Sequence, residues 1–249
     1  MQHATRRFSS RVENYIKYRP HYPQVVLEIL RNECGLTPDW QIADVGSGTG
    51  FLTKLFLRNG NPTFAIEPNK EMREAAESSL KGCPGFISID GTAEDTTLGD
   101  DSVDMIAAGQ AFHWFDPSKA KVEFHRILKP GGWIVLIWNE RRVDSSFLQA
   151  YEDLLREFAP EYEKVDHRNV DCEALADLFA PARYSTRRCE NVQTFDLEGL
   201  KGRLLSSSYA PETNNEAMLS ELARIFERHQ SDGQILFHYD ARIYLSQWP

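Results

Sequence analysis

The sequence has few cysteines and no cysteine motif. Its four cysteines, Cys34, Cys83, Cys172 and Cys189, are widely spaced, and no Cys-x-x-Cys pair occurs. This pattern argues against a disulfide framework and against the common zinc and thiol-redox motifs. Histidine and acidic residues show no metal-ligand spacing either. We therefore expect reduced thiols in a cytoplasmic protein that holds no metal ion.

Long hydrophobic runs and an excess of basic charge are also absent. The chain begins with a polar segment that no signal-peptide-like apolar stretch follows, and its longest strongly apolar run, residues 133–138, is too short to cross a bilayer. The 28 Lys and Arg residues against 37 Asp and Glu give a formal net charge of −9. Such an acidic surface disfavours nucleic acids and anionic membranes. The sequence thus predicts neither a nucleic-acid partner nor membrane insertion, and it specifies no oligomeric state.

The order of the expected elements predicts one α/β domain over residues 1–249, because no repeat and no Pro-, Gly- or Ser-rich linker divides the chain. Strands and helices alternate between residues 41 and 140, which is typical of a parallel sheet. The expected strands are 42–45, 63–67, 85–89, 103–108 and 133–138.

The two flanking regions are less regular. Residues 235–245 alternate between apolar and polar side chains, as in a strand with one buried face, and an antiparallel edge hairpin would explain them. The charged stretch 160–168 is expected to be a surface excursion. Near the start, Tyr15, Tyr18, Arg19 and Tyr22 precede Pro23, which suits the first turn of a helix through about Leu30. These aromatic residues would either cover the sheet or form a lid over a ligand.

Residues 41–50, Gln-Ile-Ala-Asp-Val-Gly-Ser-Gly-Thr-Gly, join a buried strand to a helix. Their glycines allow positive φ angles and a close approach of a ligand to the backbone, which suits a nucleotide-like cofactor at the mouth of a parallel sheet. The Gly-x-Gly-x-Gly spacing differs from the Gly-x-Gly-x-x-Gly turn of NAD-binding folds, and Asp44 would repel a pyrophosphate. No Gly-Lys-Ser/Thr follows, which excludes a P-loop.

The pattern Asp-x-Gly-x-Gly-x-Gly resembles motif I of the class I S-adenosylmethionine (SAM) methyltransferases. Four further segments follow in the order of that family: Glu67 after the second strand, and residues 91–94, 110–115 and 128–133. The resemblance covers about residues 8–140. It implies a Rossmann-like α/β fold with a mostly parallel seven-stranded sheet, an antiparallel edge hairpin and helices on both faces. It further implies an N-terminal helical lid (1–40), a SAM-binding core (41–140) and a variable acceptor-side region (141–249).

The same resemblance implies SAM as the cofactor and assigns its contacts. Glu67 would accept hydrogen bonds from the two ribose hydroxyls, and the amide of Ala93 would meet the adenine edge. The residues expected to bind SAM are Tyr15, Arg19, Asp44, Gly46, Ser47, Gly48, Gly50, Glu67, Pro68, Met72, Thr92, Ala93, Glu94, Gln110 and Ala111.

The aromatic start, the run Phe-His-Trp-Phe at 112–115 and Ser-Ser-Ser-Tyr-Ala at 206–210 are similar to small-molecule enzymes of the methyltransferase type 11 group, around trans-aconitate methyltransferase. We therefore expect methyl transfer to a small molecule, with preference for a carboxylate, in a pocket lined by Tyr22, Trp114 and Arg203. His113 would be the base if a hydroxyl or carbon acceptor had to lose a proton. Two alternatives stay open: a C- or O-methyltransferase of a quinone, phenolic or lipid-like metabolite, and a non-catalytic SAM-binding protein.

Overall fold

The computed structural model describes residues 12–160, 162, 172–207, 209–211 and 215–248. Residues 1–11 of the expected lid and nearly all of the expected excursion 160–168 lie outside them. The described elements in chain order are α2 (Val12–Tyr18), α3 (Val25–Cys34), β1 (Ile42–Val45), α4 (Phe51–Asn59), β2 (Thr63–Ile66), α5 (Lys70–Ser79), β3 (Phe86–Ile89), β4 (Val103–Gly109), the 3₁₀ turn η1 (Phe112–Trp114), α6 (Pro117–Ile127), β5 (Leu128–Arg141), α7 (Ser146–Phe158), α8 (Cys172–Phe179), β6 (Ser185–Phe195), α9 (Leu197–Leu205), α10 (Glu216–His229) and β7 (Ile235–Gln247).

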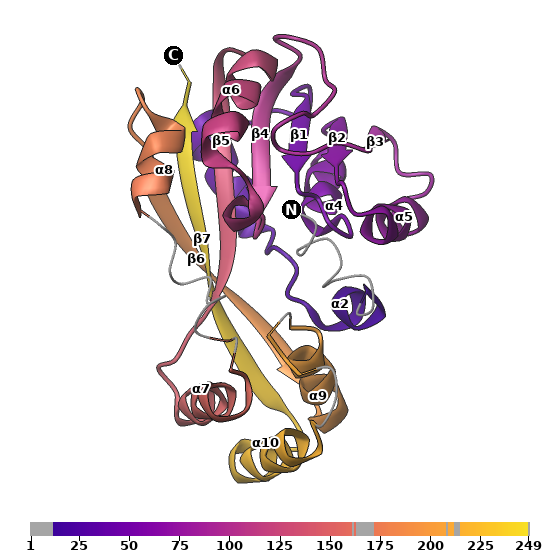
Figure 1. Cartoon of the computed structure of the whole chain (residues 1–249), viewed down its shortest axis with the longest axis vertical. Helices are drawn as coiled ribbons and strands as arrows, with labels where there is room; N and C mark the ends of the chain where they lie inside the picture. The colour runs from indigo at the N-terminus through magenta and orange to yellow at the C-terminus, as the bar shows by residue number, and fades with distance from the viewer. Residues whose placement is uncertain (1–11, 161, 163–171, 208, 212–214, 249) are drawn as a thin grey trace.

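A seven-stranded sheet in the order β3-β2-β1-β4-β5-β7-β6 organises the chain (Figure 1). The first five strands pair in parallel, whereas β7 pairs antiparallel with both β5 and β6. The predicted mostly parallel sheet with an antiparallel edge hairpin is therefore confirmed. The strand order reverses beside β1, which places the end of β1 at the switch point where such sheets bind ligands.

Helices cover both faces of the parallel part, and this explains why its central strands read as apolar runs. In β5, Ile134, Leu136 and Trp138 pack in one core with residues of α6 and α8. The intervening Val135 and Ile137 pack in another core with residues of α3 and α4. Both faces of the strand are thus buried.

The expected boundaries need two corrections. Strand β5 begins at Leu128 rather than at Trp133, because the segment predicted as a turn pairs with β4, with a register shift between Val103 and Met105. A further helix, α2, carries Tyr15 and Tyr18 of the aromatic cluster, and the helix after Pro23 begins only at Val25.

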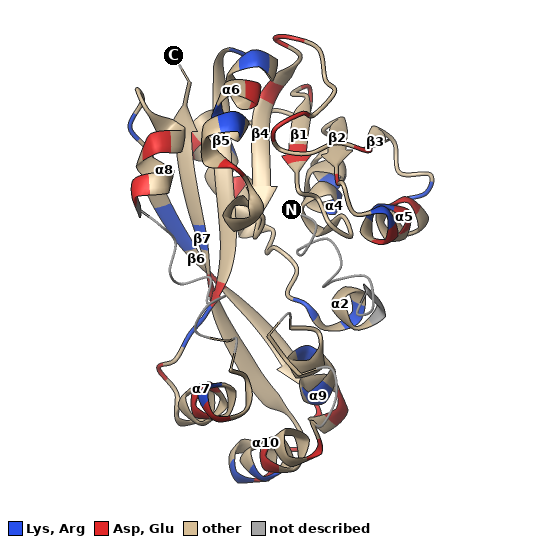
Figure 2. Ribbon diagram, viewed as in Figure 1, with Lys and Arg blue, Asp and Glu red and all other residues tan. Residues whose placement is uncertain are grey.

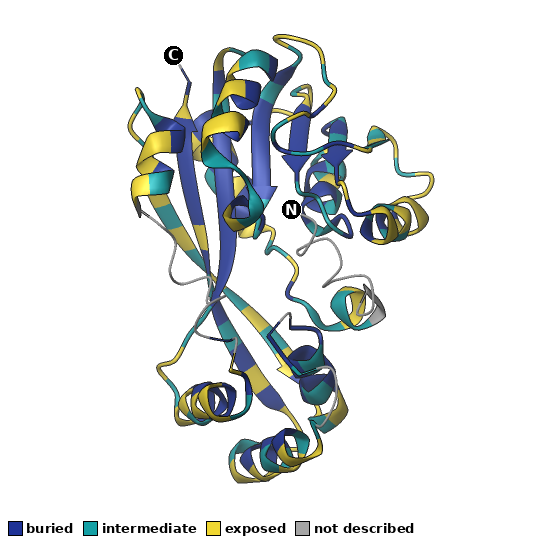
Figure 3. Cartoon of the chain, viewed as in Figure 1, coloured by how far each residue is buried: buried dark blue, intermediate teal, exposed yellow. Residues whose placement is uncertain are grey.

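Strands β6 and β7 continue past the parallel strands into a lower lobe, where α7, α9 and α10 pack around them (Figure 1). This lobe has a core of its own that includes Tyr151, Leu200, Leu222 and Phe237. The predicted alternation is clear here: Ile235, Phe237, Tyr239 and Ala241 are buried, and the side facing away from the helices is more exposed (Figure 3). Among the described helices, none has the length and apolar character needed to cross a membrane.

Helix α2 and the segment after it lie against the lower lobe and close to the sheet. The ring of Tyr18 packs on Gly202 of α9 so closely that a Cβ there would overlap it. Arg19 Nη2 donates to the carbonyl oxygen of Ser206 at 3.0 Å, and Gln193 Nε2 donates to that of Tyr18 at 3.2 Å. The N-terminal segment is therefore attached to α9 and β6 by packing and by hydrogen bonds.

This attachment predicts that Gly202→Ala destabilises the protein. Helix propensity alone would favour alanine by about 1 kcal/mol, whereas the overlap with Tyr18 should cost about 1–3 kcal/mol. We expect a lower free energy of unfolding and faster trypsin cleavage after the exposed Lys17. Gly99→Ala is the control, because a Cβ at that position would meet no described atom within 4 Å. Equal stability of Gly202→Ala and the wild type would contradict the docking of α2 on α9.

Candidate functional site

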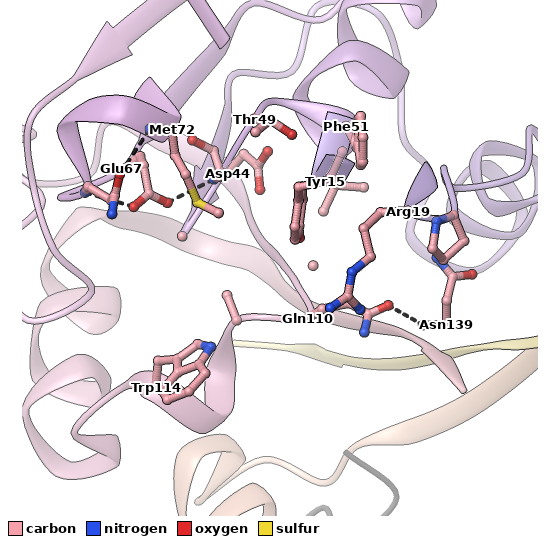
Figure 4. Close-up of a pocket in the computed structure, with 18 of the residues that line it drawn as sticks. Tyr15, Arg19, Asp44, Thr49, Phe51, Glu67, Met72, Gln110, Trp114 and Asn139 are labelled. Carbon is pink, nitrogen blue, oxygen red and sulfur yellow. Dashed lines mark hydrogen bonds between the residues drawn. The ribbon is translucent and has the colours of Figure 1, made fainter. Parts of the chain in front are cut away.

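A pocket lies at the carboxyl ends of β1, β2 and β4 and extends to α2 and the lower lobe (Figure 4). Figure 4 shows Asp44, Glu67 and Met72 on one side, with Tyr15 and Arg19 further along. The lining residues are Tyr15, Arg19, Pro20, Tyr22, Asp44, Gly46, Ser47, Gly48, Thr49, Phe51, Leu52, Glu67, Pro68, Asn69, Met72, Thr92, Ala93, Glu94, Gly109, Gln110, Ala111, Trp114, Phe115, Asn139, Glu140, Arg141, Tyr162, Arg203, Tyr209 and Tyr239.

The turn after β1 leaves three buried polar atoms without a partner. Gly48 has a φ of 56°, so the chain can turn into α4 with its backbone open to the pocket. Asp44 Oδ2 accepts from Thr53 Oγ1 at 2.6 Å, but Asp44 Oδ1, Ser47 Oγ and Thr49 Oγ1 have no hydrogen-bond partner within the described residues. Unpartnered buried polar atoms are costly. Their gathering beside a pocket indicates a ligand site.

Burial raises the pKa of the Asp44 carboxyl to about 7, although its hydrogen bond from Thr53 acts in the opposite direction. The side chain is only 1% exposed. A cationic ligand beside Oδ1 would favour the ionised form. Asp44 therefore changes its charge near neutral pH unless a bound group compensates it.

Glu67, directly after β2, is held by two backbone amides. Its Oε2 accepts from Gly48 N and its Oε1 from Asn69 N, both at 2.8 Å. Burial raises the pKa of Glu67, and these two hydrogen bonds oppose that effect. Because a carboxylate oxygen can accept two hydrogen bonds, each oxygen keeps acceptor capacity for a ligand hydroxyl.

Gln110 connects the ends of β4 and β5 at the pocket. It has a φ of 54°, which is unusual for a residue other than glycine. Its backbone N donates to Ile137 O at 2.8 Å, and its Oε1 accepts from Asn139 N at 2.9 Å, as Figure 4 shows. Such strain costs roughly 1–3 kcal/mol and clusters at ligand sites.

The opposite end of the pocket is basic and aromatic. Arg203, 5% exposed, donates from Nε to Tyr239 Oη at 2.9 Å and from Nη1 to Ser207 Oγ at 3.0 Å. Arg141 pairs with Glu152 and also donates to Tyr162. Neither Arg19 nor Arg203 has a carboxylate partner within the described part of the chain, and the Nε atoms of Arg19 and Arg141 are buried without any partner there.

The charges of Arg19 and Arg203 differ from those on the outer helices, where basic residues have acidic residues close by. On α10, for example, basic and acidic positions follow one another along the ribbon (Figure 2), and Arg224 pairs with Glu221. Burial and the nearby charge of Arg203 lower the pKa of Arg19. The inner end of the pocket thus holds positive charge that no described acidic residue balances.

Most residues predicted for the site line the pocket, with two exceptions. Gly50 caps α4, and a Cβ there would lie 2.8 Å from Leu80 Cδ1, so this glycine serves the packing of α4 on α5. His113 is exposed in η1, with its ring centroid 4.6 Å from that of Trp114, and it is not a lining residue.

Thirteen further lining residues were not predicted as site residues from the sequence, and those at the basic end include Arg141, Tyr162, Tyr209 and Tyr239. Tyr209 belongs to the motif Ser-Ser-Ser-Tyr-Ala, which singled it out without giving it a role. The alternation along residues 235–245 places Tyr239 on the buried face of its strand, but it does not indicate which residues or pocket that face contacts.

The pocket does not resemble a metal centre. Within the described residues, no three His, Cys, Asp or Glu side chains are grouped so that they could hold a metal ion.

Comparison with known proteins gives concordant results. Residues 43–136 match the family described as methyltransferase domain. An uncharacterized methyltransferase from Geobacillus kaustophilus is 30% identical, over 64% of this chain and 76% of its own. Another from Schizosaccharomyces pombe is 28% identical, over 97% of both chains. The solved structure of a protein assigned as a type II methyltransferase, from Anaeromyxobacter dehalogenans, shares the fold with a TM-score of 0.69 and 21% identity, over 92% of this chain and 97% of its own.

The raised pKa of Asp44 predicts a pH-dependent effect of Asp44→Asn on the cofactor-free protein. Because the pKa is near 7 in the folded state against an ordinary value of 3.8, the folded wild type loses stability as the pH rises from about 4 through 7. Asparagine carries no charge, so the melting temperature of the variant relative to wild type should be higher at pH 8 than at pH 5. The exposed Asp39→Asn serves as control. A pH-independent difference for Asp44→Asn would refute the assignment.

Proposed function

This chain belongs to the class I SAM-dependent methyltransferases, and we propose that it transfers the methyl group of SAM to a small molecule that presents a carboxylate. The acidic part of the pocket, which contains Asp44 and Glu67, would hold the cofactor. The basic part, which contains Arg19 and Arg203, would hold the acceptor. The observation that carries the proposal is the pair Arg19 and Arg203, which has no carboxylate partner among the described residues.

The acidic part fits SAM because this cofactor carries a sulfonium and an ammonium group as well as ribose hydroxyls. The unpartnered Asp44 Oδ1, Ser47 Oγ and Thr49 Oγ1 would hold its polar and cationic groups. The two oxygens of Glu67, fixed by backbone amides, would accept from the ribose hydroxyls. The other cofactor contacts that the family implies would come from the pocket-lining residues Pro68, Met72, Thr92, Ala93 and Glu94.

The basic part fits a carboxylate because a buried guanidinium without a counter-charge is unfavourable. Arginine binds carboxylates with two parallel hydrogen bonds, and Arg19 and Arg203 both line the pocket. Tyr22 and Trp114 add aromatic surface to the pocket lining. These features support a carboxylic acid, such as a trans-aconitate-like compound, over a neutral lipid-like metabolite.

SAM supplies an electrophilic methyl group that is already activated by its sulfonium. A carboxylate oxygen is ionised near neutral pH and needs no base. The residues of this chain then contribute position, orientation and exclusion of water. An exposed His113 is compatible with this reaction, whereas a phenol or carbon acceptor would require a base within reach of the pocket.

We also propose that residues 1–249 act as one domain, in which 1–40 cover the pocket, 41–140 bind the cofactor and 141–249 supply most of the acceptor side. The contacts of Tyr18 and Arg19 with α9 support the covering role. Within the described part of the chain, Cys34, Cys83 and Cys189 are free thiols, which supports a cytoplasmic location.

We expect Glu67→Ala to weaken SAM binding more than folding. Charge-assisted hydrogen bonds are worth roughly 1.5–3 kcal/mol each, so the dissociation constant measured by isothermal titration should rise by at least about tenfold. Glu71→Ala, an exposed carboxylate on α5, is the matched control. NAD should not bind to either variant or to the wild type. A stability loss with unchanged SAM affinity would show that Glu67 is structural, and tight NAD binding without SAM binding would refute the cofactor.

We expect Arg203→Met to raise the KM for the acceptor by roughly 10–100-fold, because a charged hydrogen-bond partner of the carboxylate is removed. The acceptor would first be found by a methyl-transfer screen over carboxylic acids, phenols and quinone precursors. His113→Gln should retain most of the turnover. A screen in which only phenols or quinone precursors react, or a large fall in turnover for His113→Gln, would favour the O- or C-methyltransferase alternative.

A further inference from the structure

Tyr209 occupies the basic part of the pocket, in the segment that follows α9. It is 8% exposed and lines the pocket. Its ring packs edge-to-face on Tyr162, with centroids 5.0 Å apart. Its hydroxyl oxygen is hydrogen-bonded by the side chain of Ser207, and Ser207 Oγ accepts from Arg203 Nη1 at 3.0 Å. Tyr209 is therefore held in place beside the arginine that faces the acceptor.

Three arginines from separate parts of the chain act on this hydroxyl. Burial alone would raise the pKa of Tyr209, but Arg141 on β5, Arg203 on α9 and Arg19 after α2, together with the hydrogen bond from Ser207, lower it below its usual value of 10. The other described titratable groups near these arginines are Tyr15 and Tyr22 beside Arg19, and Tyr151, Tyr162, Tyr239 and Glu152. Glu152 already pairs with Arg141, so the positive charge of Arg19 and Arg203 remains available.

The two protonation states of Tyr209 have opposite effects on a bound anion. A neutral phenol can donate one hydrogen bond to a carboxylate oxygen. A phenolate in the same place would bind the guanidinium groups itself and repel the carboxylate. A bound carboxylate would in turn favour the neutral phenol, because like charges disfavour each other's ionised forms.

We propose that Tyr209 is a specificity-determining residue whose neutral hydroxyl, together with Arg19 and Arg203, binds the carboxylate of the acceptor. This role rests on the proposed function and adds a named hydrogen-bond donor to it. It also assigns a task to the motif Ser-Ser-Ser-Tyr-Ala: Ser207 links Arg203 to Tyr209, and Arg19 binds the carbonyl of Ser206 in the same segment.

A spectroscopic titration tests the proposal without knowledge of the natural acceptor. The ultraviolet absorbance of tyrosinate is followed against pH in protein saturated with S-adenosylhomocysteine, with acetate or with neutral acetamide at equal ionic strength. In the wild type we expect one tyrosine to ionise at a lower pH than the others. Acetate should shift the midpoint of this early titration to higher pH, whereas acetamide should leave it unchanged. Tyr209→Phe should remove that early titration. Tyr184→Phe, a tyrosine outside the pocket lining, should retain it.

The proposal would be overturned if the early titration persisted in Tyr209→Phe, or if acetate and acetamide shifted its midpoint equally. Failure of the proposed function would be seen separately, as absent binding of S-adenosylhomocysteine or as a screen in which no carboxylic acid is methylated. This titration measures only the charge coupling at Tyr209, so the two failures remain distinct.

Steady-state kinetics on the carboxylic acid found by the screen give a second test. For Tyr209→Phe we expect a KM raised by about tenfold, as for the loss of one hydrogen bond to a charged group, with little change in kcat. We also expect kcat/KM of the wild type to fall at alkaline pH and this fall to be lost in Tyr209→Phe. A large loss of kcat, with wild-type activity rising instead through the tyrosine ionisation, would make Tyr209 a base and overturn its role as a donor.

Discussion

The pairing of β7 with both β5 and β6 is the interaction on which the two halves of the molecule depend. One end of β7 places Ile243 and Leu245 in the core beneath α3 and α4. Its other end places Phe237 and Tyr239 in the core of the lower lobe. The hydroxyl of Tyr239 also accepts from Arg203 and donates to Gln193 on β6. A single strand thereby fixes the basic part of the pocket relative to the acidic part.

This arrangement separates opposite charges within one cavity. Asp44 and Glu67 follow β1 and β2, whereas Arg203 lies on α9 and Arg19 follows α2. A cationic cofactor and an anionic acceptor would each meet the complementary part, and their mutual attraction would favour the approach of the reacting atoms. The separation follows from topology, because the carboxylates belong to the parallel half and the arginines reach the pocket from outside it.

The sequence predicts well what is encoded locally. The turn at 46–50, the carboxylate after β2 and the alternation along β7 are short-range patterns, and each is found where it was expected. Arg141, Tyr162 and Tyr209 could not be assigned, because their meeting depends on how distant segments pack. Gly50 and His113, which were also predicted for the site, do not line the pocket. A glycine in a binding motif can serve helix packing, and one position along the 3₁₀ turn η1 separates the pocket-lining Trp114 from the exposed His113.

The position of β7 in the sheet also has a consequence for the synthesis of the chain. Among the described strands, β6 lies at the sheet edge and pairs with β7 alone, yet β7 follows all the others in the sequence. The parallel strands β1 to β5 can pair while translation proceeds, whereas β6 must wait for residues 235–247 to leave the ribosome. The cofactor half of the pocket can therefore form early, and the arginine-bearing half is completed last. A nascent chain stalled before β7 would expose β6 and the apolar faces of α7, α9 and α10, and it would be the species most in need of a chaperone.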